Sequence, residues 1–276
     1  MIQDDLIKRA ATIIREADAL LITTGAGMGV DSGLPDFRGA EGFWNAYPAY
    51  RHLGLEFSEL ANPRWFRKDP ALAWGFYGHR LNLYRAANPH AGFEILRRWS
   101  AGMKWGAFVF TSNVDGQFQK AGFSEDRIVE VHGSIHHVQC LGRCGIGVFP
   151  ADAFTVSVNE ASFRGEGELP ACPRCGLLVR PNILMFGDYD FDGARTRSQQ
   201  QRLDRWLTAQ SGQLVVIELG AGRAVPTVRD FSENVIDFAG AKLIRINPRD
   251  AWVPEGGISL STGALAALEA LDVALK

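Results

Sequence analysis

The feature that most constrains the fold is a repeated alternation between short apolar runs and longer segments with helical spacing. The apolar runs are Ala19–Ile22, Ala107–Phe110, Leu214–Ile217 and Leu243–Ile246. The segments able to form helices are Asp4–Ala17, His90–Trp99, Ala194–Gln210, Val225–Phe238 and Gly263–Leu275. Buried strands that alternate with helices are typical of a parallel sheet covered on both faces. We therefore expect an α/β fold with a Rossmann-like parallel sheet and helices on both faces.

Two stretches interrupt this alternation. Residues 41–87 are rich in Trp, Tyr, Phe and Arg, and residues 139–178 carry the cysteines and a Gly/Pro-rich middle. A chain of 276 residues can form one large domain and one small one. We expect the two insertions to form a smaller zinc-binding and helical domain. The Rossmann-like domain then comprises residues 1–40, 88–138 and 179–276.

The four cysteines form two close pairs. Cys140 and Cys144 are separated by three residues, and Cys172 and Cys175 by two. Two such pairs across one loop suit tetrahedral Zn²⁺. The alternatives are four free thiols or two disulfides, and a reducing cytoplasm disfavours disulfides. Because four thiolates close the coordination sphere, we expect a structural zinc site rather than a catalytic one.

Overall charge and hydropathy argue against several classes of partner. A formal net charge of −2 gives no general field that attracts nucleic acid or an anionic membrane. No run approaches 18 consecutive apolar residues, so no transmembrane helix is expected. The N-terminal segment has apolar residues at helical spacing and lacks the apolar core of a signal peptide. We expect a cytoplasmic protein.

A glycine-rich segment, Gly25-Ala26-Gly27, follows the first apolar run. A buried strand that ends in such a loop presents backbone N–H groups to a phosphate. A dehydrogenase would continue as a helix, with an acidic ribose-binding residue about 20 residues on. Here the chain continues as "DSGLPDFRGAEGFW", whose glycines and proline disfavour a long helix. The segment therefore predicts a nucleotide-binding loop of another kind.

Polar residues follow two further apolar runs. Ser112, Asn113 and Asp115 come after the second run, and His132 follows a shorter one. The carboxyl ends of parallel strands meet at the edge where α/β sheets bind ligands. A turn without a ligand, or a structural histidine, would give the same pattern. His132 nevertheless has the location expected of a general base with a pKa near neutrality.

Taken in order, these motifs resemble the sirtuin family of NAD-dependent protein deacylases. The order is Gly-Ala-Gly, Pro-Asp-Phe-Arg-Gly, Thr-x-Asn-x-Asp, His-Gly and the paired cysteines. RPNILMFGD (180–188), INPRD (246–250) and the C-terminal helix that begins with Gly263-Ala264 follow. The resemblance covers nearly the whole chain. It implies an enzyme that uses NAD as co-substrate, transfers the acyl group of an acyl-lysine protein or peptide to ADP-ribose, and releases nicotinamide.

The resemblance also implies roles for single residues. His132 would act as general base on a ribose hydroxyl, with Asn113 as the second catalytic residue. Asp36, Asn113 and Asp115 would bind the carboxamide, and Phe37 would shield the reacting face of the ribose. The full set of expected cofactor-binding residues is Gly25, Ala26, Gly27, Asp36, Phe37, Arg38, Trp44, Ser112, Asn113, Asp115, Gly220, Gly222 and Asn247.

Tyr77 and Arg80 are three residues apart and would share one face of a helix. They resemble the Tyr-x-x-Arg pair of class III sirtuins, which reaches the distal carboxylate of a succinyl- or malonyl-lysine. The guanidinium fork suits that task because it binds a carboxylate at two points. A Tyr and an Arg at this spacing also occur on ordinary amphipathic helices. We therefore treat a preference for succinyl- or malonyl-lysine as a hypothesis that the resemblance suggests.

Three departures from the sirtuin pattern leave other functions open. Gly29 replaces a serine, Ser112 replaces a glutamine, and Ala221-Gly222 replaces a Thr-Ser pair. Losing two neutral hydrogen bonds would weaken NAD binding by roughly 30-fold. The alternatives are a mono-ADP-ribosyltransferase or NAD hydrolase on the same fold, or a non-catalytic NAD-sensing module. A zinc-ribbon nucleic-acid binder is disfavoured because acidic residues outnumber Arg164 between the cysteine pairs.

Overall fold

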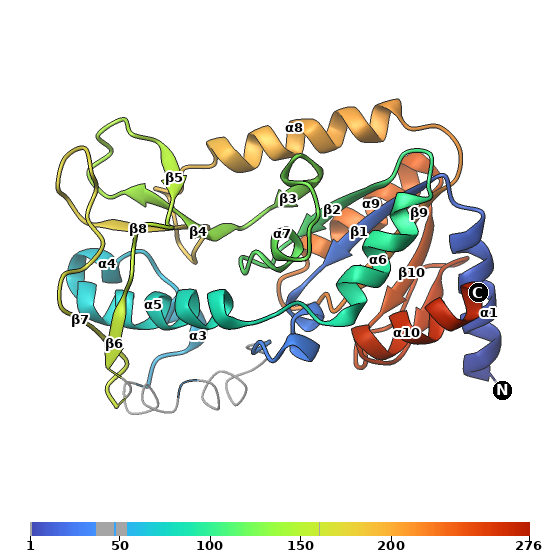
Figure 1. Cartoon of the computed structure of the whole chain (residues 1–276), viewed down its shortest axis with the longest axis horizontal. Helices are drawn as coiled ribbons and strands as arrows, with labels where there is room; N and C mark the ends of the chain where they lie inside the picture. The colour runs from blue at the N-terminus through green and yellow to red at the C-terminus, as the bar shows by residue number, and fades with distance from the viewer. Residues whose placement is uncertain (1, 37–46, 48–53, 160) are drawn as a thin grey trace.

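The computed structural model describes residues 2–36, 47, 54–159 and 161–276. Its larger part is a parallel sheet with helices on both faces (Figure 1). Among the described residues the sheet has six strands, which in spatial order are β11 (Ile258–Leu260), β10 (Lys242–Ile246), β9 (Leu214–Leu219), β1 (Ala19–Thr24), β2 (Ala107–Thr111) and β3 (Ile128–Glu130). The predicted Rossmann-like sheet is confirmed, and each of the four predicted apolar runs lies in one of its strands.

Both faces of the sheet are buried, because consecutive side chains of a strand point to opposite sides. Leu20 and Ile22 pack on one side, and Ala19 and Leu21 on the other. The first face is covered by α1 (Ile2–Arg15), α6 (Ala91–Ala101) and α10 (Ala264–Leu275), and the second by α8 (Ala194–Ala209) and α9 (Thr227–Ala239). These are the predicted helices, with ends that differ by a few residues. Two short elements, α7 (Gln117–Lys120) and η4 (Glu125–Arg127), connect β2 to β3.

The register of the strands brings their carboxyl ends to one level. Thr24 at the end of β1 is paired with Thr111 in β2 and with Leu219 in β9. Leu219 is paired in turn with Ile246 in β10, and Thr111 with Glu130 in β3. The loops that follow these strands therefore start side by side, at the edge where parallel α/β sheets bind ligands.

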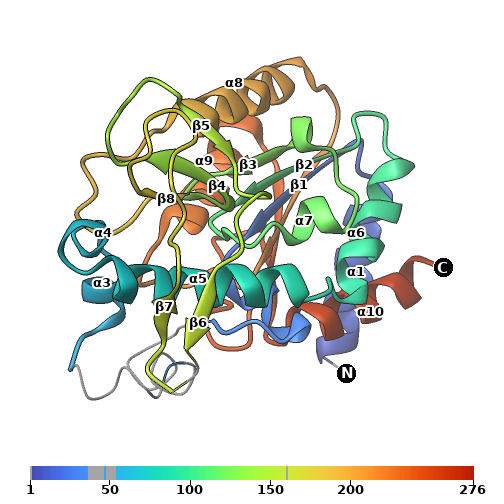
Figure 2. The same cartoon turned by 60° about the vertical axis from the view of Figure 1, so that its left-hand side comes forward.

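The smaller part of the molecule combines the helical and the cysteine-bearing insertions (Figure 2). Its elements are α3 (Phe57–Leu60), α4 (Trp65–Lys68), α5 (Pro70–Ala86), a sheet of β5 (Val148–Pro150), β4 (Gly133–Cys140) and β8 (Val179–Ile183), and a hairpin of β6 (Ser157–Asn159) and β7 (Arg164–Glu166). Its core is separate from the two layers of the large sheet and is rich in aromatic side chains. The expected helical and cysteine-bearing insertions are confirmed, whereas the exact domain boundaries stay a prediction. No helix of the described residues is long and apolar enough to cross a membrane.

Two glycines inside α5 are explained by close packing. A Cβ at Gly75 would lie 1.9 Å from the carbonyl oxygen of Phe163, and one at Gly78 would lie 2.4 Å from a methyl of Val156. Glycine inside a helix costs about 1 kcal/mol relative to alanine. Here it allows the β6–β7 hairpin to lie directly against the helix (Figure 2). The hairpin thereby fixes the helix that carries the predicted substrate-binding pair.

Candidate functional site

The predicted phosphate-binding loop packs backbone to backbone against the loop that follows β9. The N–H of Gly25 donates to the carbonyl of Leu219 (3.0 Å), and that of Gly27 donates to the carbonyl of Gly220 (3.1 Å). Gly220 has a φ of 63°, and a Cβ there would lie 2.4 Å from the carbonyl carbon of Gly27. A Cβ at Gly25 would lie 2.8 Å from the Cα of Ala221. Glycine is therefore required at both contacts.

The same loop leaves room for a phosphate group. It continues as two short 3-10 turns, η1 (Ala26–Met28) and η2 (Val30–Ser32). The first N–H group of a helical turn has no partner within that turn. A Cβ at Gly222 would have no heavy atom of the described residues within 4 Å, so within this part of the chain the neighbouring loop faces open space. Because the N–H groups of Gly25 and Gly27 are bonded within the protein, the N–H of Ala26 at the start of η1 is the donor of this loop best suited to the negatively charged diphosphate of a dinucleotide.

Asn113 joins the loop after β2 to the glycine loop. Its side-chain amide donates to the carbonyl of Gly25 (3.0 Å), and its backbone N–H donates to the hydroxyl of Thr111 (3.0 Å). The hydroxyl of Thr24 donates to the same Thr111 hydroxyl (2.8 Å), and the backbone carbonyl of Thr24 accepts the backbone N–H of Ser112 (3.0 Å). The polar residues predicted after the first two strands are thus brought together.

His132 lies in the turn that follows the next strand, β3. Its half-buried ring is hydrogen-bonded to the backbone of Ser112, and burial lowers the pKa of the imidazole below its ordinary value despite that contact. The ring is therefore neutral at pH 7 and able to accept a proton. Gly133 has a φ of 78°, and a Cβ there would lie 2.0 Å from the carbonyl oxygen of Asn182. The turn that presents His132 thus requires the glycine of the His-Gly motif.

Asp115 is a buried carboxyl group in the same loop as Asn113. Burial raises the pKa of Asp115 to about 6; the backbone N–H of Gln117, which donates to the carboxylate (3.0 Å), opposes the rise, and the negative charge of Glu130 adds to it. The backbone carbonyl of Asp115 lies 2.9 Å from Nε2 of His136. A carboxyl group with this pKa changes its charge just below neutral pH.

Tyr77 and Arg80 are buried in α5 and lie together. Nε and Nη2 of Arg80 donate to the hydroxyl of Tyr84 (3.1 and 2.9 Å), and the guanidinium carbon lies 5.9 Å from the centre of the Tyr77 ring. Burial raises the pKa of Tyr77, so its hydroxyl stays protonated. The positive charge of Arg80 also opposes the rise that burial causes in the pKa of Asp115. The helix of the small part therefore brings its arginine toward the site at the strand ends.

Two predicted cofactor-binding residues are engaged with neighbouring loops. The buried Asn247 donates to the carbonyl of Ala221 (2.8 Å) and accepts the backbone N–H groups of Arg249 and Asp250 (3.1 and 3.0 Å). Its side chain thus orders the loops after β9 and β10. The carboxylate of Asp36 lies 3.0 Å from Nη2 of Arg249. Three further predicted residues lie outside the described ranges: Phe37, Arg38 and Trp44.

Two supporting residues had no predicted role. Nε2 of His90 lies 3.0 Å from the carbonyl oxygen of Met28, and Nδ1 accepts the N–H of Gly92 (3.0 Å). Burial lowers the pKa of His90, so the neutral ring caps α6 and holds the glycine loop. Arg229 in α9 donates to the carbonyl of Ala221 (3.4 Å). For His90 the sequence holds one signal, its position as the first residue of the predicted helix His90–Trp99, whereas it holds none for Arg229.

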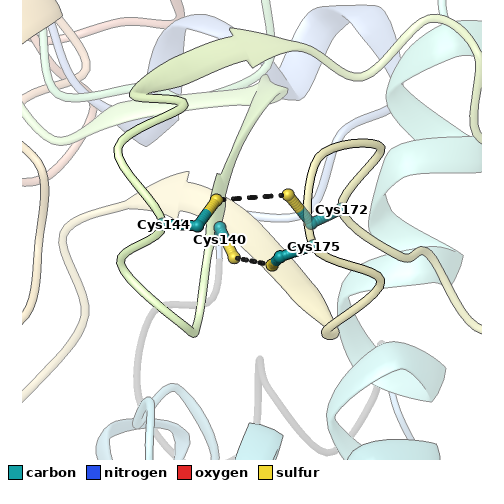
Figure 3. Close-up of side chains that lie close together, drawn as sticks. All are labelled: Cys140, Cys144, Cys172 and Cys175. Carbon is teal, nitrogen blue, oxygen red and sulfur yellow. Dashed lines mark hydrogen bonds between the residues drawn. The ribbon is translucent and has the colours of Figure 1, made fainter.

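The four cysteines converge (Figure 3). The sulfurs of Cys140 and Cys175 lie 3.5 Å apart, those of Cys144 and Cys172 lie 3.6 Å apart, and all four lie within 4.8 Å of one another. Tetrahedral Zn²⁺ with Zn–S bonds of about 2.3 Å places its sulfurs about 3.8 Å apart. A disulfide would need about 2.05 Å. The predicted four-cysteine zinc site is confirmed, and the disulfide alternative is wrong.

The strand ends bring together a glycine loop, a polar loop and a histidine, and a separate module carries four cysteines. These features define a nucleotide-binding α/β protein with a structural zinc site. The chain belongs to the Sir2 family, the sirtuins, whose family model matches residues 25–208. It is 29% identical over 242 residues to an NAD-dependent protein deacylase of Thermococcus kodakarensis, covering 88% of this chain and 84% of that protein. It is 35% identical over 238 residues to NAD-dependent protein deacylase 2 of Pyrobaculum aerophilum, covering 86% and 82%.

Solved structures of the family share the whole fold. A crystal structure of a Sir2 homologue in complex with NAD has a TM-score of 0.71 and 27% identity, covering 96% of this chain and 93% of that one. A mutant Sir2 homologue in complex with ADP-ribose has a TM-score of 0.73 and 26% identity, covering 97% and 95%. The likeness therefore extends over both parts of the molecule.

Proposed function

We propose that this protein is an NAD-dependent protein-lysine deacylase that transfers the acyl group to ADP-ribose and releases nicotinamide. The observation that carries the proposal is the connection between adjacent strand ends, where Asn113 is bonded to Gly25 and the His132 ring to Ser112. Membership of the Sir2 family supports it, as do the names of the relatives.

Within this proposal, NAD supplies an electrophilic ribose carbon with nicotinamide as its leaving group. Asp115 binds the carboxamide of nicotinamide, and Asn113 orients the ribose above the glycine loop. The acyl-lysine carbonyl oxygen attacks the ribose carbon as nicotinamide departs. His132, neutral because burial lowers its pKa, takes the proton from a ribose hydroxyl. The hydroxyl oxygen then attacks the acyl carbon, and the lysine amine leaves with the proton that His132 returns. Addition of one water molecule to the acyl carbon opens the resulting ribose-bridged intermediate and gives O-acyl-ADP-ribose and free lysine.

The diphosphate would lie over Gly25, Ala26 and Gly27, between this loop and the loop that contains Gly220 and Gly222. Open space at Gly222 supports this placement. The partner is an acyl-lysine protein or peptide bound between the sheet and the small domain, where its backbone can pair with local backbone. Its sequence would be bound mainly through main-chain contacts.

We further propose a preference for succinyl- or malonyl-lysine. Arg80 is buried, is held by the hydroxyl of Tyr84, and lies close enough to Asp115 for its charge to oppose the rise in the pKa of that carboxyl group. A buried guanidinium beside the reaction site favours an acyl group that ends in a carboxylate. The protonated hydroxyl of Tyr77 supplies a second donor on the same face of α5.

The preference is tested with acetyl-, malonyl- and succinyl-lysine versions of one peptide. Arg80→Met should lower kcat/KM for the acidic acyl groups by about 100-fold and change acetyl removal by less than about threefold. Tyr84→Phe should have a smaller effect in the same direction, because it removes the hydroxyl that holds the guanidinium. Equal loss on all three peptides would contradict the preference, since it would mark Arg80 as a structural residue.

The products decide between the deacylase and its alternatives. Transfer to ADP-ribose should yield O-acyl-ADP-ribose in equal amount to nicotinamide. Free ADP-ribose with the peptide left intact would indicate an NAD hydrolase, and ADP-ribose attached to protein would indicate a transferase. Calorimetric binding of NAD without release of nicotinamide would indicate a sensing module.

A further inference from the structure

A basic cavity of about 130 Å³ lies in the small part of the molecule, away from the strand ends that form the proposed catalytic site. It is bounded by α4, the end of β4, the start of β8 and the segment after β8. Four arginines line it, together with a single acidic residue, Asp190; the arginines are Arg64, Arg67, Arg143 and Arg180. The lining is therefore strongly basic in a chain whose overall charge is slightly negative.

Arg180 is the unusual member of this set. Its side chain is only 1% exposed, and Nη2 is paired with Asp188. Nε and Nη1 are buried as well, and no hydrogen-bond partner for either is found in the described part of the chain. Buried donors of a charged group are almost always satisfied, since an unmade hydrogen bond there is costly. The two nitrogens carry three N–H groups, which lie unsatisfied behind the wall of the cavity, so the buried guanidinium adds a positive charge that only Asp188 offsets.

The other arginines form an exposed rim. Arg67 donates to the carbonyl of Leu141 (3.1 Å), which fixes one side of the rim, and Arg143 is ion-paired with Asp190 on the other side. Arg64 lies over the ring of Trp65, 5.1 Å from its centre. Asp188 and Asp190 balance Arg180 and Arg143, so two of the four lining arginines, Arg64 and Arg67, have no ion pair with an acidic residue in the described part of the chain.

We propose that this cavity binds the phosphate group of an anionic ligand. A phosphate monoester carries nearly two negative charges at pH 7 and several acceptor oxygens. Its charge matches the two unbalanced arginines, and its acceptor oxygens match the exposed N–H groups of the arginines on the rim. Arginine binds phosphate in two-point fashion, which gives the interaction direction as well as charge.

One rival explanation comes from the metal site. A zinc ion with four thiolates carries two net negative charges, and Cys140 also lines the cavity. The arginines would then serve only to balance that charge. Arg174 separates the two explanations, because it is exposed between Cys172 and Cys175 but does not line the cavity. Its removal changes the charge near the metal and leaves the cavity lining unchanged.

The test is a titration of the zinc-bound protein with inorganic phosphate, followed by calorimetry at constant ionic strength. Saturating ADP-ribose is present so that the proposed cofactor site does not contribute. We expect saturable binding that is weakened at least tenfold in the double variant Arg67→Gln/Arg143→Gln and unchanged in Arg174→Gln. All altered residues are exposed, so the fold should survive, and the zinc content of each variant is measured in parallel.

Phosphoserine and a phosphoserine peptide are titrated as further probes. Tighter binding of the peptide would identify a phosphorylated protein as the source of the phosphate, and equal binding would identify free phosphate. The proposal is overturned if chloride and phosphate behave alike, or if Arg174→Gln weakens binding as much as the double variant does. It is also overturned if the double variant loses zinc while no phosphate binds to the wild-type protein. None of these results depends on deacylase activity.

Discussion

The side-chain amide of Asn113 donates a 3.0 Å hydrogen bond to the backbone carbonyl of Gly25. This bond connects the loop after β2 to the glycine loop after β1, the two loops that would hold the ribose and the diphosphate. It orients the asparagine from a half-buried position. The proposed catalytic residue is therefore fixed by the same loop that would bind the cofactor.

Asn113→Asp should separate orientation from space filling. The carboxylate has nearly the same shape, but it cannot donate to Gly25 and it would face a carbonyl oxygen. We expect kcat for deacylation to fall by about 100-fold or more, as for removal of a single catalytic donor. ADP-ribose binding, measured by calorimetry, should change by less than about fivefold. Activity within a few-fold of the wild type would show that Asn113 is not a catalytic residue.

Asp115→Asn should stabilise the fold and impair the enzyme. The folded-state pKa of Asp115 is raised to about 6 from 3.8, so its proton stabilises the fold at low pH and this contribution is lost as the pH rises through about 6. At pH 8 the neutral amide should raise the free energy of unfolding by up to about 3 kcal/mol. Urea denaturation at pH 5 and pH 8 measures this difference. A variant that is less stable than the wild type at pH 8 would contradict it.

The activity of the wild type should also fall at acid pH. Asp115 gains a proton at a pH of about 6, and the pKa of His132 lies below its ordinary 6.5. Both groups are therefore in their basic forms above pH 7, and kcat/KM should be flat there and decline below about pH 6. A decline that begins above pH 7 would mean that neither group controls the reaction.

Two glycines that depart from the sirtuin pattern should respond differently to serine. Among the residues that the structure describes, a Cβ at Gly222 meets nothing within 4 Å, whereas one at Gly29 lies 3.2 Å from Leu34. Gly222→Ser should be tolerated and should strengthen ADP-ribose binding up to about fivefold through one added hydrogen bond. Gly29→Ser should lower Tm, because Leu34 must move. Calorimetry and thermal unfolding of both variants check this contrast, and the reverse order of effects would contradict it.

Removal of zinc should destabilise the small part of the molecule. The four cysteines join the end of β4 to the loop that precedes β8, so metal loss frees both segments. A loss of about 4 kcal/mol would lower Tm by roughly 10 °C in a chain of this size. We expect one zinc per chain in the wild type by elemental analysis and almost none in Cys175→Ser. Full thermal stability of a zinc-free sample would refute the structural role.

The sequence predicted the large sheet well because its strands are buried on both faces and read as uninterrupted apolar runs. β11 was not predicted, since three residues at the edge of a sheet leave little pattern. The polar residues after β2 and β3 were predicted together because parallel strand ends share one edge. The supporting roles of Asn247 and Arg229 depend on contacts between distant loops, which no local pattern encodes, whereas the position of His90 at the start of a predicted helix is a local signal for its capping role.

The small part was predicted only in outline. Its helices and cysteines were expected, but the β6–β7 hairpin was not, because its strands are short and partly exposed. The reason for glycine at 75 and 78 is visible only once the hairpin lies against α5. The cavity lined by Arg180 likewise arises where four separate segments meet, so its arginines are scattered along the sequence.

Mass spectrometry of an acyl-lysine peptide incubated with the protein, with and without NAD, tests the proposed deacylase activity directly. We expect removal of the acyl group only with NAD, together with the appearance of O-acyl-ADP-ribose. His132→Ala should abolish both while it retains ADP-ribose binding. Intact acetyl, malonyl and succinyl peptides after complete consumption of NAD would contradict it, as would full activity of His132→Ala.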